Sequence, residues 1–165
     1  MPPKIRPFHP SETETLHRLV AEMQDFERLI DTRLLAGDEM AVAYTAEMRA
    51  RCDREAGTIL VADIDGVIAG FVAVRAAVPS EELDQPPGTY ALVSDLSVDA
   101  NYRGRGTGRA LLAAAERYAA EQGATELRIA VLTGNVVADA LYRSAGFRPY
   151  LQTMSKMLPD SAPSG

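Results

Sequence analysis

The feature that most constrains this chain is a glycine-rich turn at residues 102–109 (YRGRGTGR), which lies between a strand-like run and a helical pattern. Residues 90–98 (YALVSDLSV) are rich in β-branched and aromatic side chains and have the length of a strand. Beyond the turn, apolar residues recur on one helical face: Leu111, Leu112, Ala115, Tyr118 and Ala119. A strand, a glycine turn and a helix start direct free backbone N–H groups and the positive end of a helix dipole to one point. The stretch therefore predicts a phosphate-binding turn.

Two common phosphate motifs do not fit this turn. The dinucleotide fingerprint needs glycine at its sixth position, which is Arg109 when counted from Gly104 and Leu111 when counted from Gly106. The P-loop needs Gly-Lys-Ser/Thr after four spacer residues, and no such tripeptide follows either glycine. The turn therefore belongs to another class of phosphate site.

The pattern that remains, Arg103-x-x-Gly106-x-Gly108, resembles motif A of the GNAT N-acetyltransferase superfamily, in which the backbone of the turn holds the pyrophosphate of acetyl-CoA. Two flanking segments extend the resemblance. Residues 95–98 (DLSV) look like the end of the family's fourth strand. Residues 135–147 (NVVADALYRSAGF) look like its Asn-x-x-Ala-x-x-Leu-Tyr-x-x-x-Gly-Phe block. The N-terminal third resembles the family only in the order of its elements.

The resemblance implies an α/β fold with a mixed central sheet of roughly six to seven strands, two of them parallel and splayed, and about four helices. We expect residues 1–158 to form a single domain and residues 159–165 to be a disordered tail. Ser11 with Glu14 fits a capping box, Asp65-Gly66 predicts a type I′ hairpin, and Asn135 is expected to cap a short helix. Strands are expected at residues 5–7, 58–64, 67–74, 90–98, 127–132 and 147–157.

The resemblance also implies roles for individual residues. Cofactor binding is expected at Leu96, Ser97, Val98, Arg103, Gly104, Arg105, Gly106, Thr107, Gly108, Arg109 and Asn135. Tyr142 matches the family tyrosine that protonates the coenzyme A thiolate, and the alternative is a packed aromatic side chain. Asp95 is the candidate general base, because an alkyl amine with a pKa near ~10.4 is protonated at pH 7. The family's glutamate on this strand is replaced by Ser94, so a structural role for Asp95 stays open.

Composition limits the partners of the chain. A formal net charge of −6 argues against a nucleic-acid-binding protein, because such domains usually carry a basic face. No apolar run is long enough to cross a bilayer and residues 1–10 lack the apolar part of a signal peptide, so we expect no membrane partner and a cytoplasmic protein.

A lone cysteine, Cys52, and two histidines give no metal cluster, so no metal is expected. Cys52 is expected to be a small, partly buried hydrophobe. The three arginines of the turn suit a polyanionic cofactor, and a solvated patch is the alternative.

The sequence thus predicts direct transfer of an acetyl group from acetyl-CoA to a primary amine. The acceptor is left open between a small amine, such as a polyamine, an aminoglycoside or an amino acid, and a protein amine. Candidates for contacting a cationic acceptor lie in the N-terminal helices: Glu22, Asp25, Phe26, Glu27, Tyr44 and Glu47. The alternative function is a non-catalytic acyl-CoA-binding sensor. Homodimers are common in the family, so a homodimer is a further expectation.

Overall fold

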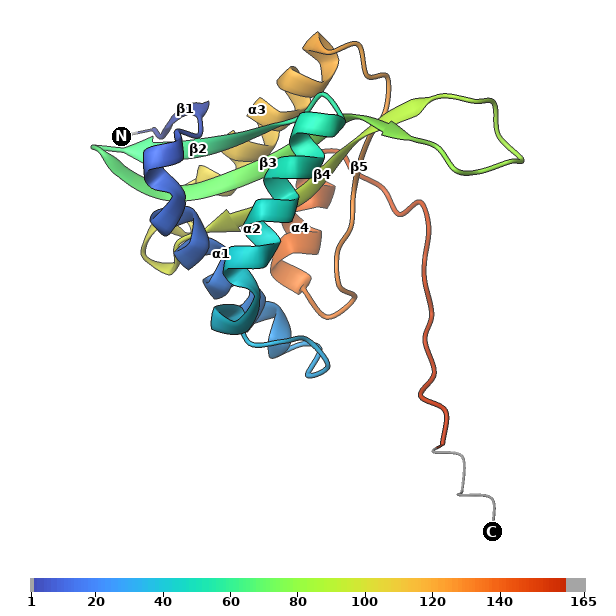
Figure 1. Cartoon of the computed structure of the whole chain (residues 1–165), viewed down its shortest axis with the longest axis horizontal. Coiled ribbons are helices and arrows are strands. Elements are labelled where there is room, and N and C mark those ends of the chain that lie inside the picture. The colour runs from blue at the N-terminus through green and yellow to red at the C-terminus, as the bar shows by residue number, and fades with distance from the viewer. Residues whose placement is uncertain (1, 160–165) are drawn as a thin grey trace.

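Helices cover both faces of one mixed sheet in the computed structural model, which describes residues 2–159 (Figure 1). Within these residues the sheet has five strands in the order β1-β2-β3-β4-β5, and β4–β5 is its parallel pair. The strands are β1 (Lys4–Pro7), β2 (Thr58–Ile64), β3 (Val67–Pro79), β4 (Thr89–Val98) and β5 (Leu127–Ile129). The α-helices are α1 (Thr13–Arg28), α2 (Gly37–Arg54), α3 (Thr107–Glu121) and α4 (Val136–Ser144). The predicted α/β class and its four helices are confirmed.

Alternating side chains on the strands build two cores, one on each face of the sheet. In β3, Val72 and Val74 belong to the cluster that includes residues of α3 and α4, whereas Phe71 and Ala73 belong to the cluster under α1 and α2. All four side chains are fully buried. Figure 1 shows the same division, with α1 and α2 on the near side of the sheet and α3 behind it.

A β-bulge interrupts β4 at Ser94. The register with β3 moves from Val74 opposite Val93 to Ala73 opposite Asp95, so Ser94 is an extra residue in the strand. In a regular strand Asp95 would lie on the same face as Val93, because side chains alternate. The extra residue instead turns Asp95 toward α2, where it meets a tyrosine hydroxyl. Bulges often re-aim a side chain beside an active site in this way.

The parallel strands β4 and β5 separate next to the bulge in β4. Pairing between β4 and β5 ends at Val93 and Ile129, whereas β4 continues to Val98. Among the described residues, the last part of β4 therefore has no strand on its β5 side. The carbonyl of Val98 there accepts a hydrogen bond from Nε of Arg103 at 2.9 Å. The strand predicted at residues 127–132 stops at Ile129 because the two strands diverge. The expected splay is present.

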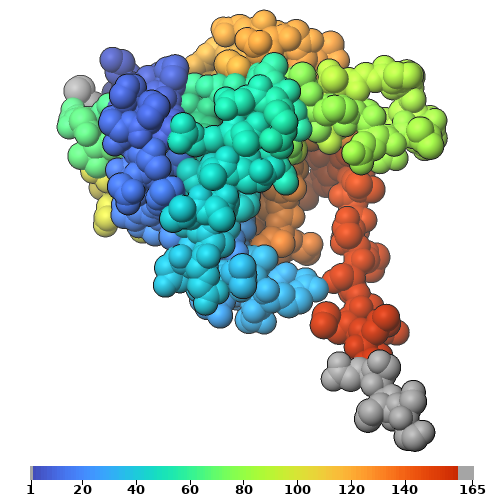
Figure 2. All heavy atoms as spheres, in the orientation of Figure 1, coloured from blue at the N-terminus to red at the C-terminus, as the bar shows by residue number. Residues whose placement is uncertain are grey.

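The strand predicted at residues 147–157 is wrong, since residues 147–159 contain no strand. Pro149 has no N–H for a strand ladder, and the neighbouring edge strand β5 has only three residues. Figure 1 shows this segment leaving the sheet, and in Figure 2 its red spheres project from the body of the molecule. Leu151 and Met154 in this segment are exposed. The described sheet consequently has five strands rather than six to seven. Residues 160–165 of the predicted disordered tail lie outside the described residues.

The predicted capping box occurs a few residues earlier than expected. His9 rather than Ser11 is the N-cap of a short 3₁₀ turn before α1, and its backbone N–H donates to the carboxylate of Glu12 rather than of Glu14. Pro10 occupies the first helical position, where its fixed φ favours a helix start. The Asp65-Gly66 hairpin is formed as predicted: β2 pairs with β3, and both turn residues have positive φ.

Cys52 lies in the core under α2. Its side chain is 4% exposed, and burial raises the pKa of its thiol to about 12. A thiol with so high a pKa holds almost no thiolate at neutral pH. Cys52 is therefore a buried hydrophobe, as its sequence context indicates.

Candidate active site

Several backbone N–H groups without a hydrogen-bond acceptor in residues 2–159 lie together where the glycine turn meets the start of α3. Gly104 and Gly106 have φ values of 71° and 81°, and a Cβ at either position would meet nothing within 4 Å. Within the described chain, the N–H groups of residues 105–109 donate to no other residue. Unpaired N–H groups at a helix N-terminus form an anion site. The turn therefore fits a pyrophosphate group that approaches the backbone closely.

Two residues of the turn, Thr107 and Gly108, are in close contact with the rest of the protein. Thr107 is 2% exposed, and its hydroxyl donates to the carbonyl of Tyr102 at 3.5 Å. A Cβ at Gly108 would lie 3.2 Å from Cδ2 of Leu141, so glycine there allows α3 and α4 to pack closely. These contacts leave only the backbone of Thr107 and Gly108 available to a ligand.

The three arginines of the turn are exposed. The guanidinium of Arg103 lies 5.6 Å from the ring centroid of Phe26, and that of Arg109 donates to the hydroxyl of Ser144 at 3.0 Å. Neither of these arginines, nor Arg105, forms an ion pair with a carboxylate in residues 2–159. Their positive charge is therefore available to a polyanion.

A cleft of about 290 Å³ opens where β4 and the chain after β5 diverge. Its volume is near the lower end of the range for small-molecule sites. The lining consists of Met23, Gln24, Glu27, Tyr44, Ser94, Asp95, Leu96, Ala130, Val131, Leu132 and Tyr142. The charged residues among them are Glu27 and Asp95, so the cleft carries negative charge and no lysine or arginine.

Asp95 lines this cleft and is 6% exposed. Its Oδ1 accepts a hydrogen bond from the hydroxyl of Tyr44 at 2.6 Å, and its Oδ2 accepts one from the hydroxyl of Ser94 at 2.7 Å. Burial raises the pKa of Asp95, and the two hydroxyl donors oppose that rise. A carboxylate with a raised pKa is a stronger base than an exposed one, which suits proton transfer.

Glu27 brings a second carboxylate to the cleft from α1. Its side chain is half-buried, and it has no hydrogen bond or ion pair with any residue between 2 and 159. Burial raises the pKa of Glu27, and the negative charge of Asp95 adds to the rise. Glu27 is thus an available anionic group inside the cleft.

Tyr142 reaches the cleft from α4 and is 9% exposed. Burial raises the pKa of its phenol to about 12, with smaller contributions from the charges of Glu27 and Asp95. The phenol is therefore neutral at physiological pH and can donate a proton or a hydrogen bond. No residue of the described chain accepts a hydrogen bond from its hydroxyl, which leaves that donor free for a ligand.

Asn135 fixes the start of the helix that carries Tyr142. Its Oδ1 accepts from the backbone N–H of Ala138 at 3.1 Å, as predicted for an N-cap. We expect Asn135→Ala to lower the free energy of unfolding by about 1 kcal/mol, because it leaves that N–H unpaired. Urea unfolding measures the change. Asn135→Ser restores an N-cap oxygen and should lose less than half as much, and an equal loss in both variants would contradict the cap.

The structure brings some predicted site residues together and separates others. Asp95, Leu96 and Tyr142 line one cleft. Ser97 and Val98 lie outside that lining: the hydroxyl of Ser97 points to α1, and Val98 packs against the α3 core. Both residues belong to the part of β4 that extends beyond its pairing with β5.

Of the six acceptor candidates, Glu27 and Tyr44 line the cleft and the other four do not. The other four have different contacts: Glu22 with Arg18, Asp25 with the N–H of Gly37, Phe26 with Arg103, and Glu47 with Arg51 and Arg54. The sequence did not single out Met23, Gln24 or the chain after β5 as lining residues. Met23 is spaced four residues before Glu27, so the helical period was the available signal.

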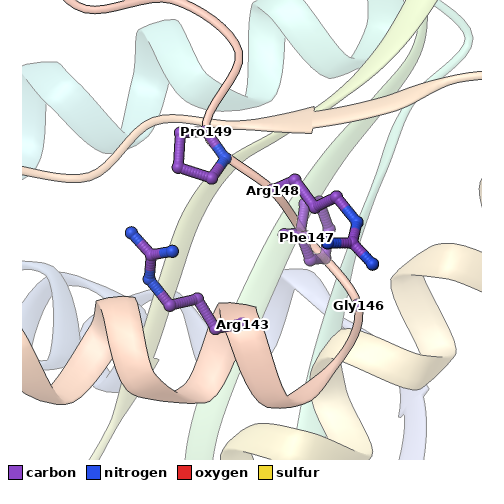
Figure 3. Close-up of a pocket in the computed structure, with 5 residues that line it drawn as sticks. All are labelled: Arg143, Gly146, Phe147, Arg148 and Pro149. Atoms are coloured by element: carbon purple, nitrogen blue, oxygen red, sulfur yellow. The ribbon is translucent and has the colours of Figure 1, made fainter.

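A second hollow of about 340 Å³ lies beside the end of α4. Figure 3 shows its lining, in which the side chains of Arg143 and Arg148 extend in different directions. Arg143 donates to the carboxylate of Asp139 at 2.7 Å. This hollow contains none of the predicted site residues.

No helix of residues 2–159 is long and apolar enough to span a bilayer, and those residues hold no group of His, Cys, Asp or Glu side chains placed to bind a metal.

Known proteins resemble the chain in sequence and in fold. The model of a family described as "Acetyltransferase (GNAT) family" matches residues 23–147. Streptothricin acetyltransferase from Streptomyces lavendulae is 33% identical over 95 residues, which are 58% of this chain and 46% of that protein. Mycothiol acetyltransferase from Clavibacter sepedonicus is 39% identical over 93 residues, which are 56% of this chain and 27% of that protein. The chain thus spans less than half the length of either relative.

A solved structure of the aminoglycoside N-acetyltransferase AAC(6')-Iy in complex with CoA has a TM-score of 0.70 to this chain. The alignment covers 94% of each chain at 16% sequence identity. At that identity the likeness concerns the fold alone.

Proposed function

The chain belongs to the GNAT acetyltransferase family, and we propose that it transfers the acetyl group of acetyl-CoA to a primary amine of a small molecule. The observation that carries the proposal is the position of Asp95 and Tyr142 in one cleft at the splay of β4 and β5. The names of the two relatives, streptothricin acetyltransferase and mycothiol acetyltransferase, support acetyl transfer to a small acceptor.

The turn and the open part of β4 would hold acetyl-CoA. The free N–H groups of residues 105–109 and the arginines would bind the pyrophosphate, and the backbone of residues 96–98 would pair with the pantetheine amides. Acetyl-CoA supplies an acetyl group activated as a thioester. A strand N–H near Leu96 would donate to the carbonyl oxygen as its negative charge develops.

Asp95 would receive the proton of the amine through Tyr44. The attacking nitrogen must be neutral, and it becomes acidic as its bond to the acetyl carbon forms. Its proton then passes to the hydroxyl oxygen of Tyr44 while the Tyr44 proton passes to Oδ1 of Asp95 along the 2.6 Å hydrogen bond. The raised pKa of Asp95 favours this transfer. Tyr142 would donate its proton to the departing sulfur.

The proposal is tested by acetyl-CoA-dependent release of thiol against a panel of polyamines, aminoglycosides, amino acids and basic peptides. Calorimetric binding of acetyl-CoA to the same protein is the internal control. Turnover on a small amine supports the proposal. Tight binding without turnover on any amine would favour the acyl-CoA sensor, and the absence of binding would contradict the assignment of the turn.

We expect Tyr44→Phe to lower kcat about tenfold or more, because it removes the hydroxyl between the amine and Asp95. The hydroxyl of Tyr44 also lowers the pKa of Asp95, so its loss raises that pKa further. Since the base must be unprotonated, the acidic limb of the kcat/KM profile should move to higher pH. Tyr90→Phe, at a tyrosine outside the cleft lining, is the matched control. An unchanged pH profile in Tyr44→Phe would contradict the relay.

A further inference from the structure

The acceptor cleft has two negative charges and no positive one in its lining. Glu27 and Asp95 are its carboxylates, and lysine, arginine and histidine are absent from the residues that line it. Arg51 and Arg75 lower the pKa of Asp95 from outside the lining, and each already forms an ion pair with a glutamate. The charge of the cleft is therefore left for a ligand to compensate.

The proposed reaction neutralises only one of these two carboxylates, because a single proton leaves the amine and Asp95 receives it. The nitrogen that accepts the acetyl group attacks as a neutral amine, and its proton ends on Asp95. The resulting amide is uncharged, so the reacting nitrogen offers Glu27 no lasting positive charge either before or after transfer. A half-buried carboxylate without a partner is unfavourable, because burial removes part of its hydration. A second cationic group on the acceptor would remove this imbalance.

We propose that the acceptor is a small molecule with at least two amino groups, of which one is acetylated and another is held as an ammonium by Glu27. The inference rests on the proposed function and narrows its acceptor class. The cleft volume of about 290 Å³ suits a short diamine or one amino-sugar ring rather than a folded protein surface. Gln24 and Tyr44 lie in the same lining and offer polar atoms to such a ligand.

The bound ammonium would also assist the departure of the thiol. The charges of Glu27 and Asp95 help to raise the pKa of Tyr142, which weakens it as an acid. A cation beside Glu27 offsets part of that effect and brings the phenol closer to the acidity that proton donation needs. Glu27 thus links binding of a dication to the chemistry on the other side of the cleft.

The test compares putrescine with butylamine, which share a four-carbon chain and differ in the second amino group. Each amine is measured by steady-state thiol release and by calorimetric binding, in the unmodified protein, Glu27→Gln and Glu14→Gln. We expect putrescine to be preferred about tenfold or more, as a charge-assisted hydrogen bond would provide. Glu27→Gln should raise the KM and the dissociation constant for putrescine about tenfold and leave those for butylamine within about twofold. Glu14 lies on the same helix with a side chain 97% exposed, so Glu14→Gln should preserve the preference.

Each contrary result has a distinct meaning. Equal affinity and equal turnover of the two amines would overturn the inference and leave acetyl transfer intact. Equal loss of turnover on both amines in Glu27→Gln, with binding unchanged, would overturn it by making Glu27 the general base. A binding preference that Glu27→Gln removes, without turnover on any amine, would support the dication site and contradict the proposed function. Thermal unfolding of Glu27→Gln checks that the variant is folded.

Discussion

Tyr142→Phe is expected to lower kcat about 10²-fold while changing the dissociation constant of acetyl-CoA by less than about twofold. The substitution removes one hydroxyl and keeps the ring, which packs against the α3 core and lies 6.1 Å from the ring of Phe147. The hydroxyl has no acceptor in the described chain, so the expected loss falls on the step in which sulfur needs a proton. Single-turnover kinetics and calorimetry measure the two quantities separately.

Tyr118→Phe is the matched control for this variant. Its hydroxyl donates to the carbonyl of Ala56 at 3.0 Å, outside the cleft, so kcat should not change. Equal losses of kcat and of acetyl-CoA affinity in Tyr142→Phe would contradict the general-acid role. Such a result would make Tyr142 a packed aromatic side chain of α4.

Gly106→Val is expected to weaken acetyl-CoA binding by about 10²-fold or more. A side chain at this position would enter the open space in front of the free N–H groups, where nothing in the protein lies within 4 Å of a Cβ. Its φ of 81° also disfavours a β-branched residue, so part of the effect is strain in the turn. Calorimetry measures the affinity, and thermal unfolding measures the strain.

Gly66→Val separates these two effects. Gly66 has a φ of 83° in the hairpin between β2 and β3, and a Cβ there would also meet nothing within 4 Å. The two variants should lose comparable stability, on the order of 1–3 kcal/mol, and only Gly106→Val should lose acetyl-CoA affinity. A folded Gly106→Val with unchanged affinity would exclude the turn as the pyrophosphate site.

Features set by neighbouring residues were predicted well from the sequence. The glycine turn, the Asp65-Gly66 hairpin and the Asn135 cap each depend on a few adjacent positions with special backbone or side-chain requirements. The strand at residues 147–157 was not formed, because apolar composition does not provide a partner strand.

The cleft depends on contacts that no local pattern records. Tyr44 and Asp95 are 51 residues apart in sequence and meet because α2 packs over the bulge in β4. The bulge is nevertheless detectable in the sequence. The apolar residues that face α3 are 91, 93, 96 and 98, so the alternation of inward and outward side chains shifts by one residue at Ser94. In the sequence, nothing distinguishes Glu27 from other charged residues of a helix; the fold places it in the lining of the cleft. Only the tertiary structure distinguishes it from Glu22, five residues earlier and paired with Arg18.

The buried state of Cys52 gives every variant described above its own folding reporter. Thiol reagents attack thiolates, and the one thiol of this chain is enclosed under α2 with a pKa raised to about 12. In the native protein such reagents therefore detect released coenzyme A with little background from the enzyme. Labelling of Cys52 itself requires the core to open, so its rate measures local or global unfolding. The same chemistry that counts turnovers can thus distinguish a variant that has lost a catalytic group from one that has lost its structure.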